Sequence, residues 1–286
     1  LIIPIRDTRK KIIGFGARLI EPKEDVAKYI NSPQSPVFHK RRHLYGLDLL
    51  SHNQLKQSPI FVVEGYTDVI MLHQGGIETA VATLGTSLTS EHINKLLSFS
   101  KHICFCFDGD NAGQKAAERA LDLIIPFAYD GTEIEFLSMK HGEDPDSLVV
   151  KGGGQAFTDY YQQNVQGIDT VLLKPVHAAI EQQLSLSRQA GIIKETSDKI
   201  DKIPNGYLSN LLKHKLDNFS PTVQSAPAPQ KAQRHDAKGD QVNRPTNIMS
   251  RAIALVLQNP TLTQSLTLPS DLQIFNYPAV IMFREI

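Results

Sequence analysis

The chain has 286 residues, and its 30 Lys and Arg residues balance 30 Asp and Glu residues. This length is enough for a sizeable core and for two or more domains. A composition of 41% hydrophobic and 21% charged residues is typical of soluble globular proteins. The formal net charge of zero excludes a globally basic nucleic-acid binder, so any basic surface must be local.

No apolar stretch approaches the ~18 residues that a membrane span needs, and no secretory signal opens the chain. We therefore expect no membrane association. The only cysteines, Cys104 and Cys106, lie in "HICFCF" and are interpreted as core thiols of a buried strand. Sparse cysteine fits a reducing cytoplasm. The first residues, "LIIPIRD", already have a strand pattern, and no Met precedes them. We expect part of the natural protein to be missing on the N-terminal side.

Residues 1–20, "LIIPIRDTRKKIIGFGARLI", predict two strands around the polar turn "DTRKK". The next stretch, residues 28–46, is polar and punctuated by proline, which predicts an irregular loop. From Ile60 the pattern changes to short apolar strands that alternate with helical segments. Such alternation indicates βαβ units, and therefore a parallel sheet covered by helices on both faces.

The predicted strands of this unit are 60–64, 79–85, 102–110 and 133–139, and the predicted helices are 67–75, 90–100 and 111–127. After "GEDPDSLVVKGGG" we expect no further strand, and the three glycines at 152–154 are interpreted as a linker turn. Residues 155–220 have helical periodicity. Residues 221–245 are rich in Ala, Pro and Gln and predict a linker. The segment 246–286 predicts the start of another helical unit, which we expect the chain end to interrupt.

Acidic residues follow the ends of three predicted strands. Glu64 ends the first strand, Asp108 and Asp110 follow the third, and Asp144 and Asp146 follow the fourth. Because parallel strands end at the same sheet edge, we expect these carboxylates to lie close together. Without cations they would raise one another's pKa values. A hard divalent ion such as Mg²⁺, which prefers oxygen ligands, would resolve that repulsion.

A simpler interpretation is that Asp108 and Asp110 only cap the helix that begins at "NAGQKAAERA". Capping explains one Asp, and it leaves the other acids and the intervening Gly109 unexplained. Lys115 and Arg119, on the same predicted helix, are interpreted as ordinary charges of its surface.

These residues carry a resemblance. The motifs "VVEGYTD", "TLGTS", "FDGDNAGQKAA" and "GEDPDSL" resemble the TOPRIM domain of primases, topoisomerases and some nucleases. The flanking "PIRDTRKKIIGFGARLI" and "KYINSPQSPVFHK" resemble the segment that precedes this domain in bacterial replicative DNA primases of the DnaG type. The resemblance extends from about residue 1 to residue 220. Thr67 stands where the family usually has Met, and "GAR" replaces its common Gly-Gly-Arg.

The resemblance implies an α/β fold: a TOPRIM parallel sheet with helices on both faces, preceded by a small mixed α+β segment and followed by a helical bundle. The implied domains are 1–58, the end of the N-terminal subdomain of the core; 59–150, TOPRIM; 151–220, a helical subdomain; 221–245, the linker; and 246–286, the start of a helicase-interaction domain. Zinc is expected only in the N-terminal module that this chain lacks.

The resemblance also implies an activity: synthesis of short RNA primers from ribonucleoside triphosphates on single-stranded DNA, assisted by Mg²⁺ or Mn²⁺. The protein would act in the bacterial cytoplasm at the replication fork, with the replicative helicase as partner. Glu64 would be a metal ligand or the base that takes the hydroxyl proton, and Asp68 a supporting acid. Asp108, Asp110, Asp144 and Asp146 would hold metal directly or through water.

Further positions follow from the matched motifs. Gly65 and Gly109 would allow tight turns and a close approach of phosphate, whereas Gly85 and Thr86 fit that role and a plain turn equally well. The basic residues expected to face template or triphosphate are Arg18, Lys28 and Lys40, with Arg6 as a weaker candidate.

Two other functions stay open at this point. One is a TOPRIM enzyme that cleaves DNA, a topoisomerase or nuclease, although none of the eight tyrosines has the context of a transesterifying residue. The other is a non-catalytic nucleic-acid adaptor with a degenerate site, against which the intact acids argue.

Overall fold

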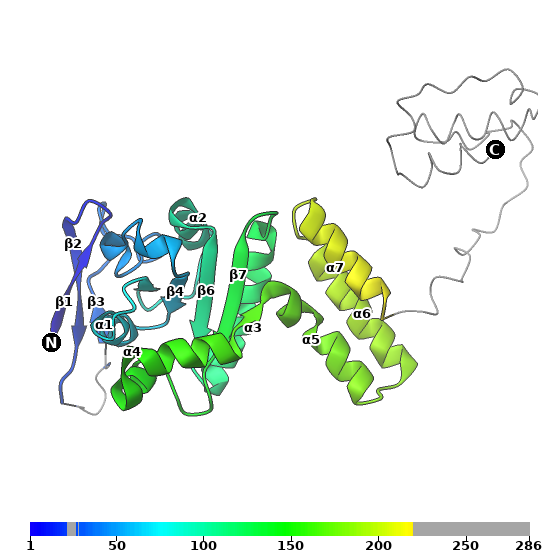
Figure 1. Ribbon diagram of the computed structural model, residues 1–286. Helices are drawn as coiled ribbons and strands as arrows, with labels where there is room; N and C mark the ends of the chain where they lie inside the picture. The colour runs from blue at the N-terminus through cyan, green and yellow to red at the C-terminus, as the bar shows by residue number, and fades with distance from the viewer. Residues whose placement is uncertain (22–26, 28, 220–286) are drawn as a thin grey trace, which may run out of the picture. The chain divides into compact units, whose positions relative to one another are not determined.

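The computed structural model describes residues 1–21, 27 and 29–219, which belong to one compact unit (Figure 1). Its strands are β1 (Ile2–Arg6), β2 (Ile12–Arg18), β3 (Tyr29–Asn31), β4 (Ile60–Val63), β5 (Ala80–Ala82), β6 (His102–Phe107), β7 (Glu133–Ser138) and β8 (Gln166–Gly167). Its α-helices are α1 (Tyr66–Gln74), α2 (Ser90–Phe99), α3 (Asn111–Ile124), α4 (Pro145–Asn164), α5 (Ile168–Glu181), α6 (Leu186–Ile200) and α7 (Tyr207–Asp217). Three 3-10 turns are η1 (Leu47–Leu49), η2 (Gln54–Lys56) and η3 (Ile125–Phe127).

The N-terminal residues form a three-stranded antiparallel sheet in the order β1-β2-β3. The predicted turn between the first two strands is confirmed. There the Asp7 side chain accepts hydrogen bonds from the backbone N–H groups of Arg9 and Lys11, each at 2.9 Å. The prediction of an irregular loop from residue 28 onward is wrong for β3, which pairs with β2 through Gly16 and Asn31. Three residues are too short to show a strand periodicity.

The second sheet has the order β5-β4-β6-β7-β8. Its first four strands run parallel, as predicted from the alternation of strands and helices. The short β8 adds an antiparallel edge by pairing Gly167 with Glu135 of β7. The expectation that strands stop after the glycine run is therefore wrong.

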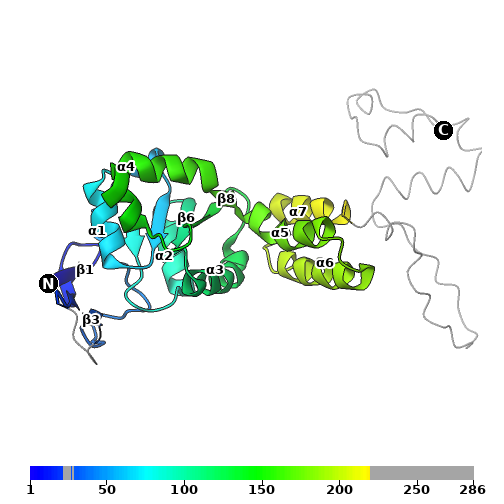
Figure 2. The same cartoon turned by 90° about the horizontal axis from the view of Figure 1, so that it is seen from below.

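Helices cover both faces of this sheet. Figure 2 shows α1 and α4 on one side of the strands and α2 and α3 on the other. Alternate residues of β4 enter the two cores: Phe61 packs edge-on against Phe157 of α4 at 5.1 Å between ring centres, whereas Val62 joins the core on the other face. Cys104 and Cys106 are buried free thiols in the α1/α4 core, as predicted. Strands buried on both faces read as continuous apolar runs, which explains the sequence pattern.

The three glycines at 152–154 form a kink within α4. Gly152 and Gly153 leave the helical conformation, and Gly153 has φ of 72°, a value that favours glycine. Gly154 lies directly against the end of α1, where a Cβ would stand 1.8 Å from the carbonyl oxygen of Gly75. The predicted turn is confirmed at Gly152 and Gly153, where the helix breaks. The sequence did not show that Gly154 also packs against the end of α1. Helix α4 also crosses the domain boundary predicted at residue 150.

The N-terminal sheet packs on the parallel sheet through tyrosines. A Cβ at Gly16 would stand 2.9 Å from the ring of Tyr66, which is the first residue of α1. The Tyr66 hydroxyl donates a hydrogen bond to the Asn31 side chain, and its ring meets Tyr45 edge-on at 4.9 Å. These contacts hold β2 and β3 beside the helix that follows Glu64.

The helices after β8 form a small bundle. Residues of α5, α6 and α7, among them Leu172, Ile200 and Leu212, share the core of the α2/α3 face. Asp130, in the turn before β7, accepts hydrogen bonds at 2.8 Å from the backbone N–H groups of Tyr207 and Leu208. It therefore caps the start of α7 and attaches the bundle to the sheet.

Among residues 1–21, 27 and 29–219, no helix is both long and apolar enough to cross a membrane. The predicted linker at 221–245 and the predicted helical unit at 246–286 lie outside the described residues, as does Lys28.

Candidate metal centre

Glu64 and Asp108 meet at the carboxyl ends of two neighbouring strands. Strands β4 and β6 pair in parallel with Val62 opposite Phe105, which brings their ends to the same edge of the sheet. The backbone N–H of Asp108 points to Oε1 of Glu64 at 3.4 Å. The predicted convergence of these two acids is therefore seen in the structure.

Asp110 and Asp144 each cap a helix. Asp110 accepts a hydrogen bond at 2.7 Å from the N–H of Gly113 at the start of α3, and Asp144 accepts one at 2.8 Å from Ser147 at the start of α4. The capping interpretation is thus correct for Asp110. Asp108 caps no helix: its Oδ1 is buried and has no hydrogen-bond partner among the described residues.

Asp68 joins the cluster from the first turn of α1. One carboxylate oxygen each from Asp68, Asp144 and Asp146 lies within 4.8 Å of the others. Asp68 is only 6% exposed, and it accepts a hydrogen bond at 2.9 Å from the backbone N–H of Gly65. The sequence predicts Asp68 only as a supporting acid. In the structure its carboxylate is a possible metal ligand in the same way as those of Asp144 and Asp146.

The cluster is electrostatically strained without a cation. Burial, followed by the negative charges of Glu64 and Asp68, raises the pKa of Asp108 to about 7. Burial and the neighbouring Asp146 raise the pKa of Asp68 to about 7. Burial also raises the pKa of Glu64. Burial alone would raise the pKa of Asp144, but hydrogen bonds from Ser147 lower it overall.

These residues fit a divalent metal. All ligand atoms are carboxylate oxygens, which hard cations prefer. Within the described residues no Lys or Arg forms an ion pair with Glu64, Asp68 or Asp108. The buried, unpartnered Oδ1 of Asp108 is the kind of atom that a bound cation would satisfy. A doubly charged ion would also remove the repulsion that raises the pKa values.

The glycines near the acids have different roles. A Cβ at Gly109 would stand 1.7 Å from the carbonyl oxygen of Lys140, so only glycine allows these two main-chain segments to approach so closely. Gly65 precedes α1 in an extended conformation and donates its N–H to Asp68. Gly85 has φ of 68°, which makes it the turn residue of the loop after β5.

The basic residues predicted to bind template or triphosphate lie in different environments. The Arg18 guanidinium lies over the ring of Tyr29 at 5.4 Å, and the Tyr29 hydroxyl is 3.4 Å from that of Thr67 on α1. Lys40 is half-buried, and its carbonyl oxygen contacts the His92 ring at 3.0 Å. Arg6 donates to the carbonyl oxygen of Lys10 and so belongs to the first hairpin turn.

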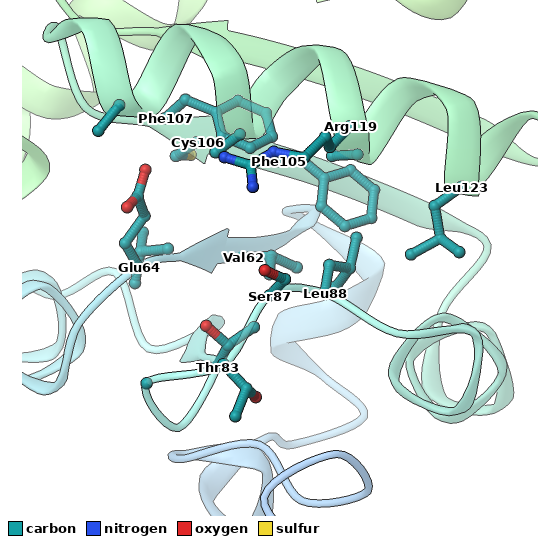
Figure 3. A pocket seen from close by; sticks show the side chains of 16 residues that line it. Val62, Glu64, Thr83, Ser87, Leu88, Phe105, Cys106, Phe107, Arg119 and Leu123 are labelled. Atoms are coloured by element: carbon teal, nitrogen blue, oxygen red, sulfur yellow. The ribbon is translucent and has the colours of Figure 1, made fainter.

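Arg119 is the residue that the sequence analysis missed. The sequence predicts an ordinary helix-surface charge here, whereas in the structure Arg119 lines a pocket whose wall also includes Glu64 (Figure 3). The available signal was the spacing of Ala112, Ala116 and Ala120, which puts small side chains on the same side of α3 as Arg119.

A second group of three possible ligands lies at the opposite edge of the sheet, where β6 and β7 begin. It comprises His102, Glu133 and Glu135. Here Glu135 is already paired: it contacts His102 Nε2 at 2.9 Å and accepts a hydrogen bond from the Tyr161 hydroxyl at 2.7 Å. Glu135 therefore has hydrogen-bond donors of its own within the protein.

Residues 1–51 match the family model of the DNA primase catalytic core, N-terminal domain, and residues 58–137 match that of the Toprim domain. A DNA primase domain from Pseudomonas aeruginosa is 42% identical with a TM-score of 0.70, over 76% of this chain and 67% of that one. A DnaG primase catalytic domain solved with bound single-stranded DNA is 38% identical with a TM-score of 0.64, over 76% of this chain and 69% of that one. The chain belongs to the DnaG family of DNA primases.

Membership of the DnaG family confirms the predicted resemblance and fold class. A full-length DnaG relative, the DNA primase of Pseudomonas aeruginosa, is 41% identical over 220 residues. That match covers 77% of this chain but only 33% of the relative. The chain therefore spans about a third of the length of this curated DnaG protein.

Proposed function

We propose that this chain is the metal-binding catalytic part of a primase, an RNA polymerase that makes short primers on single-stranded DNA. The observation that carries the proposal is the acid cluster at the carboxyl edge of the sheet, with its unpartnered Asp108 Oδ1 and its raised pKa values. Family membership supports it, because the relatives reported above are primases. In the reaction, a ribonucleotide 3′-hydroxyl attacks the α-phosphate of a nucleoside triphosphate and pyrophosphate leaves.

We propose that the acids have different roles in this reaction, according to where they lie. Glu64 contacts the backbone of Asp108, and the negative charge of Asp110 acts on Glu64. Asp68, Asp144 and Asp146 form a second group of neighbouring carboxylates. When bound, a divalent metal, which we propose to be Mg²⁺ or Mn²⁺, neutralises charge at the reacting phosphate. Because burial raises the pKa of Glu64, its carboxylate is a better proton acceptor than an exposed one, and it serves as the hydroxyl's base or as a metal ligand.

The nucleic acid would reach this edge from the N-terminal sheet. Arg18 is fixed over Tyr29, which contacts α1 next to Glu64, and this supports a role in binding template or triphosphate. Lys40 is proposed for the same role, Arg6 is a weaker candidate, and Lys28 is carried over from the sequence alone. Contacts of this kind to phosphate give affinity that falls with salt. Binding of a replicative helicase through residues 246–286, action at the replication fork and zinc in a preceding module remain predictions.

A chimaera tests the proposal. The matching segment of the Pseudomonas aeruginosa primase is replaced by this chain's segment, with and without Asp108→Asn. With single-stranded template, ribonucleotides and Mg²⁺, the parent chimaera should make RNA, and the variant should lose roughly 1000-fold in rate, about 4 kcal/mol of transition-state stabilisation. Equal activity of parent and variant would overturn the proposal.

The same chimaera addresses the alternative of DNA cleavage. Nicking or relaxation of supercoiled plasmid that depends on Asp108 would favour a topoisomerase or nuclease. No relative reported above supports that alternative. Retention of DNA without any chemistry would favour the adaptor.

A further inference from the structure

A crevice of about 380 Å³ opens beside Glu64, between the loop at 83–88 and helix α3. Figure 3 shows Glu64 at one end of it, Leu123 towards the other, and the side chains of Val62 and Phe105 between them. Its volume lies at the small end of the range for small-molecule sites.

The crevice exists because of the residues that α3 presents to it. Ala112, Ala116 and Ala120 recur at every fourth position, so one face of α3 carries only small side chains and leaves space beside it. The opposite wall is apolar and comes from β4, β6 and Leu88 of the loop. A cleft with these walls suits a flat organic group better than a hydrated phosphate.

The polar and charged residues that line the crevice are Glu64, Thr83, Thr86, Ser87 and Arg119. The Nε–H of Arg119 donates to the Lys115 carbonyl oxygen at 3.0 Å, which orients the guanidinium. Within the described residues no carboxylate forms an ion pair with Arg119. Thr86 Oγ1, in the loop, is buried without a hydrogen-bond partner in the same part of the chain. A planar guanidinium stacks on aromatic rings, and hydroxyls pair with sugar or base edges.

We propose that this crevice receives the ribose and base of the nucleoside triphosphate, and that Arg119 stacks on or hydrogen-bonds to that nucleoside part. The inference rests on the proposed function, which places the phosphates at the acids. Glu64 belongs to both features: it lines the crevice and contacts Asp108. A ligand that extends from the acid cluster past Glu64 into an apolar cleft therefore has an anionic end and a flat organic end.

The test compares two probes on the full chain: ATP with Mg²⁺, and inorganic tripolyphosphate with Mg²⁺, which lacks the nucleoside. Ala116→Leu fills the crevice and Arg119→Ala removes the guanidinium. Lys115→Ala is the matched control, since it removes a charge from the same helix and keeps the carbonyl group that orients Arg119. Binding is measured by titration calorimetry, and thermal unfolding confirms that each variant is folded. Arg119 is exposed, so its variant does not depend on repacking a core.

We expect both crevice variants to bind ATP about 10-fold more weakly, with tripolyphosphate binding changed less than about 2-fold and the control unchanged for both probes. Equal losses for ATP and tripolyphosphate, or unchanged ATP binding in both variants, would overturn the crevice assignment. So would a wild-type chain that binds ATP no more tightly than tripolyphosphate.

A parallel titration with Mn²⁺ separates this proposal from the proposed function. If Mn²⁺ binds and Asp108→Asn weakens it, the metal centre stands whatever the crevice variants show. If Asp108→Asn leaves the affinity for Mn²⁺ unchanged, the proposed function is wrong, and the crevice assignment that rests on it is wrong as well.

Discussion

The two edges of the parallel sheet carry similar residues in opposite electrostatic states. At the carboxyl edge, one carboxylate oxygen each from Asp68, Asp144 and Asp146 lies within 4.8 Å of the others. At the amino edge, Glu135 is met by His102 and by the Tyr161 hydroxyl. The pKa of Asp68 is raised by burial and neighbouring acids, whereas hydrogen bonds from His102 and Tyr161 outweigh burial and lower the pKa of Glu135.

The difference separates a ligand site from a structural network. A cluster that supplies its own donors gains stability from its charges and needs nothing from solution. Repulsion within a cluster of acids alone lowers the stability of the folded protein, and a bound cation removes that repulsion. Proximity of possible ligand atoms is common to both, so the presence of internal partners is the better criterion.

The largest expected effect compares the two clusters directly. The double variant Asp68→Asn/Asp146→Asn removes two charges from the carboxyl edge, and we expect Mn²⁺ affinity to fall roughly 1000-fold, about 4 kcal/mol. The matched double variant Glu133→Gln/Glu135→Gln should leave Mn²⁺ affinity within about 2-fold. Electron paramagnetic resonance of free Mn²⁺ measures both. Comparable losses in the two variants would remove the distinction between the edges.

The second effect concerns the backbone that supports the acidic edge. Gly109→Ala places a methyl group 1.7 Å from the Lys140 carbonyl oxygen, and we expect it to lower the free energy of unfolding by about 3 kcal/mol. Gly191→Ala is the control, because it lies within α6 with no atom near its Cβ position. It should raise stability by up to about 1 kcal/mol. Urea denaturation of both variants decides.

The third effect concerns the amino edge. Tyr161→Phe removes the hydrogen bond to Glu135, and we expect the free energy of unfolding to fall by about 1–2 kcal/mol at pH 6. The pKa of His102 is raised chiefly by its hydrogen bond to Glu135, so its share of the stability is lost as pH rises through the folded pKa. The pKa of Glu135 is lowered, so its share is lost as pH falls. Stability unchanged by Tyr161→Phe would contradict a structural role.

The smallest effect is the response of the whole chain to Mg²⁺. Asp68 and Asp108, each with a pKa raised to about 7, bind protons more tightly folded than unfolded. Metal-free stability should therefore decline as pH rises from about 4 to 7. At pH 8, Mg²⁺ at tenfold its Kd should restore about 1.4 kcal/mol, and at pH 5 much less, because protons compete. Thermal unfolding at the two pH values, with Ca²⁺-free buffers, checks this; a larger Mg²⁺ effect at pH 5 would contradict it.

Much of this could be predicted from the sequence, for reasons of geometry. Apolar runs such as "HICFCF" predicted the parallel strands, and parallel strands bring Glu64 and Asp108 to one edge. The role of Asp68 depends on how α1 and α4 pack, and no local pattern encodes that. The same is true of Gly109, whose neighbour is a backbone atom about thirty positions away.

The shortest strands and the pocket could not be predicted from the sequence. Strands β3 and β8 have three and two residues, so pairing partners define them more than their own side chains do. Arg119 could be assigned to its helix, but the crevice that it lines depends on the loop after β5. Capping by Asp110, in contrast, follows local chemistry and was foreseen.

The glycine contact between α1 and α4 has a consequence for tuning this protein. Gly75 and Gly154 let two main chains touch, and the same two helices carry Asp68 on one side and Asp144 and Asp146 on the other. The contact therefore sets how closely the end of α1 approaches α4 just after its kink. A methyl group at position 154 would push these two main chains apart, and the metal preference of such a variant would show how far the acids depend on helix spacing across the kink.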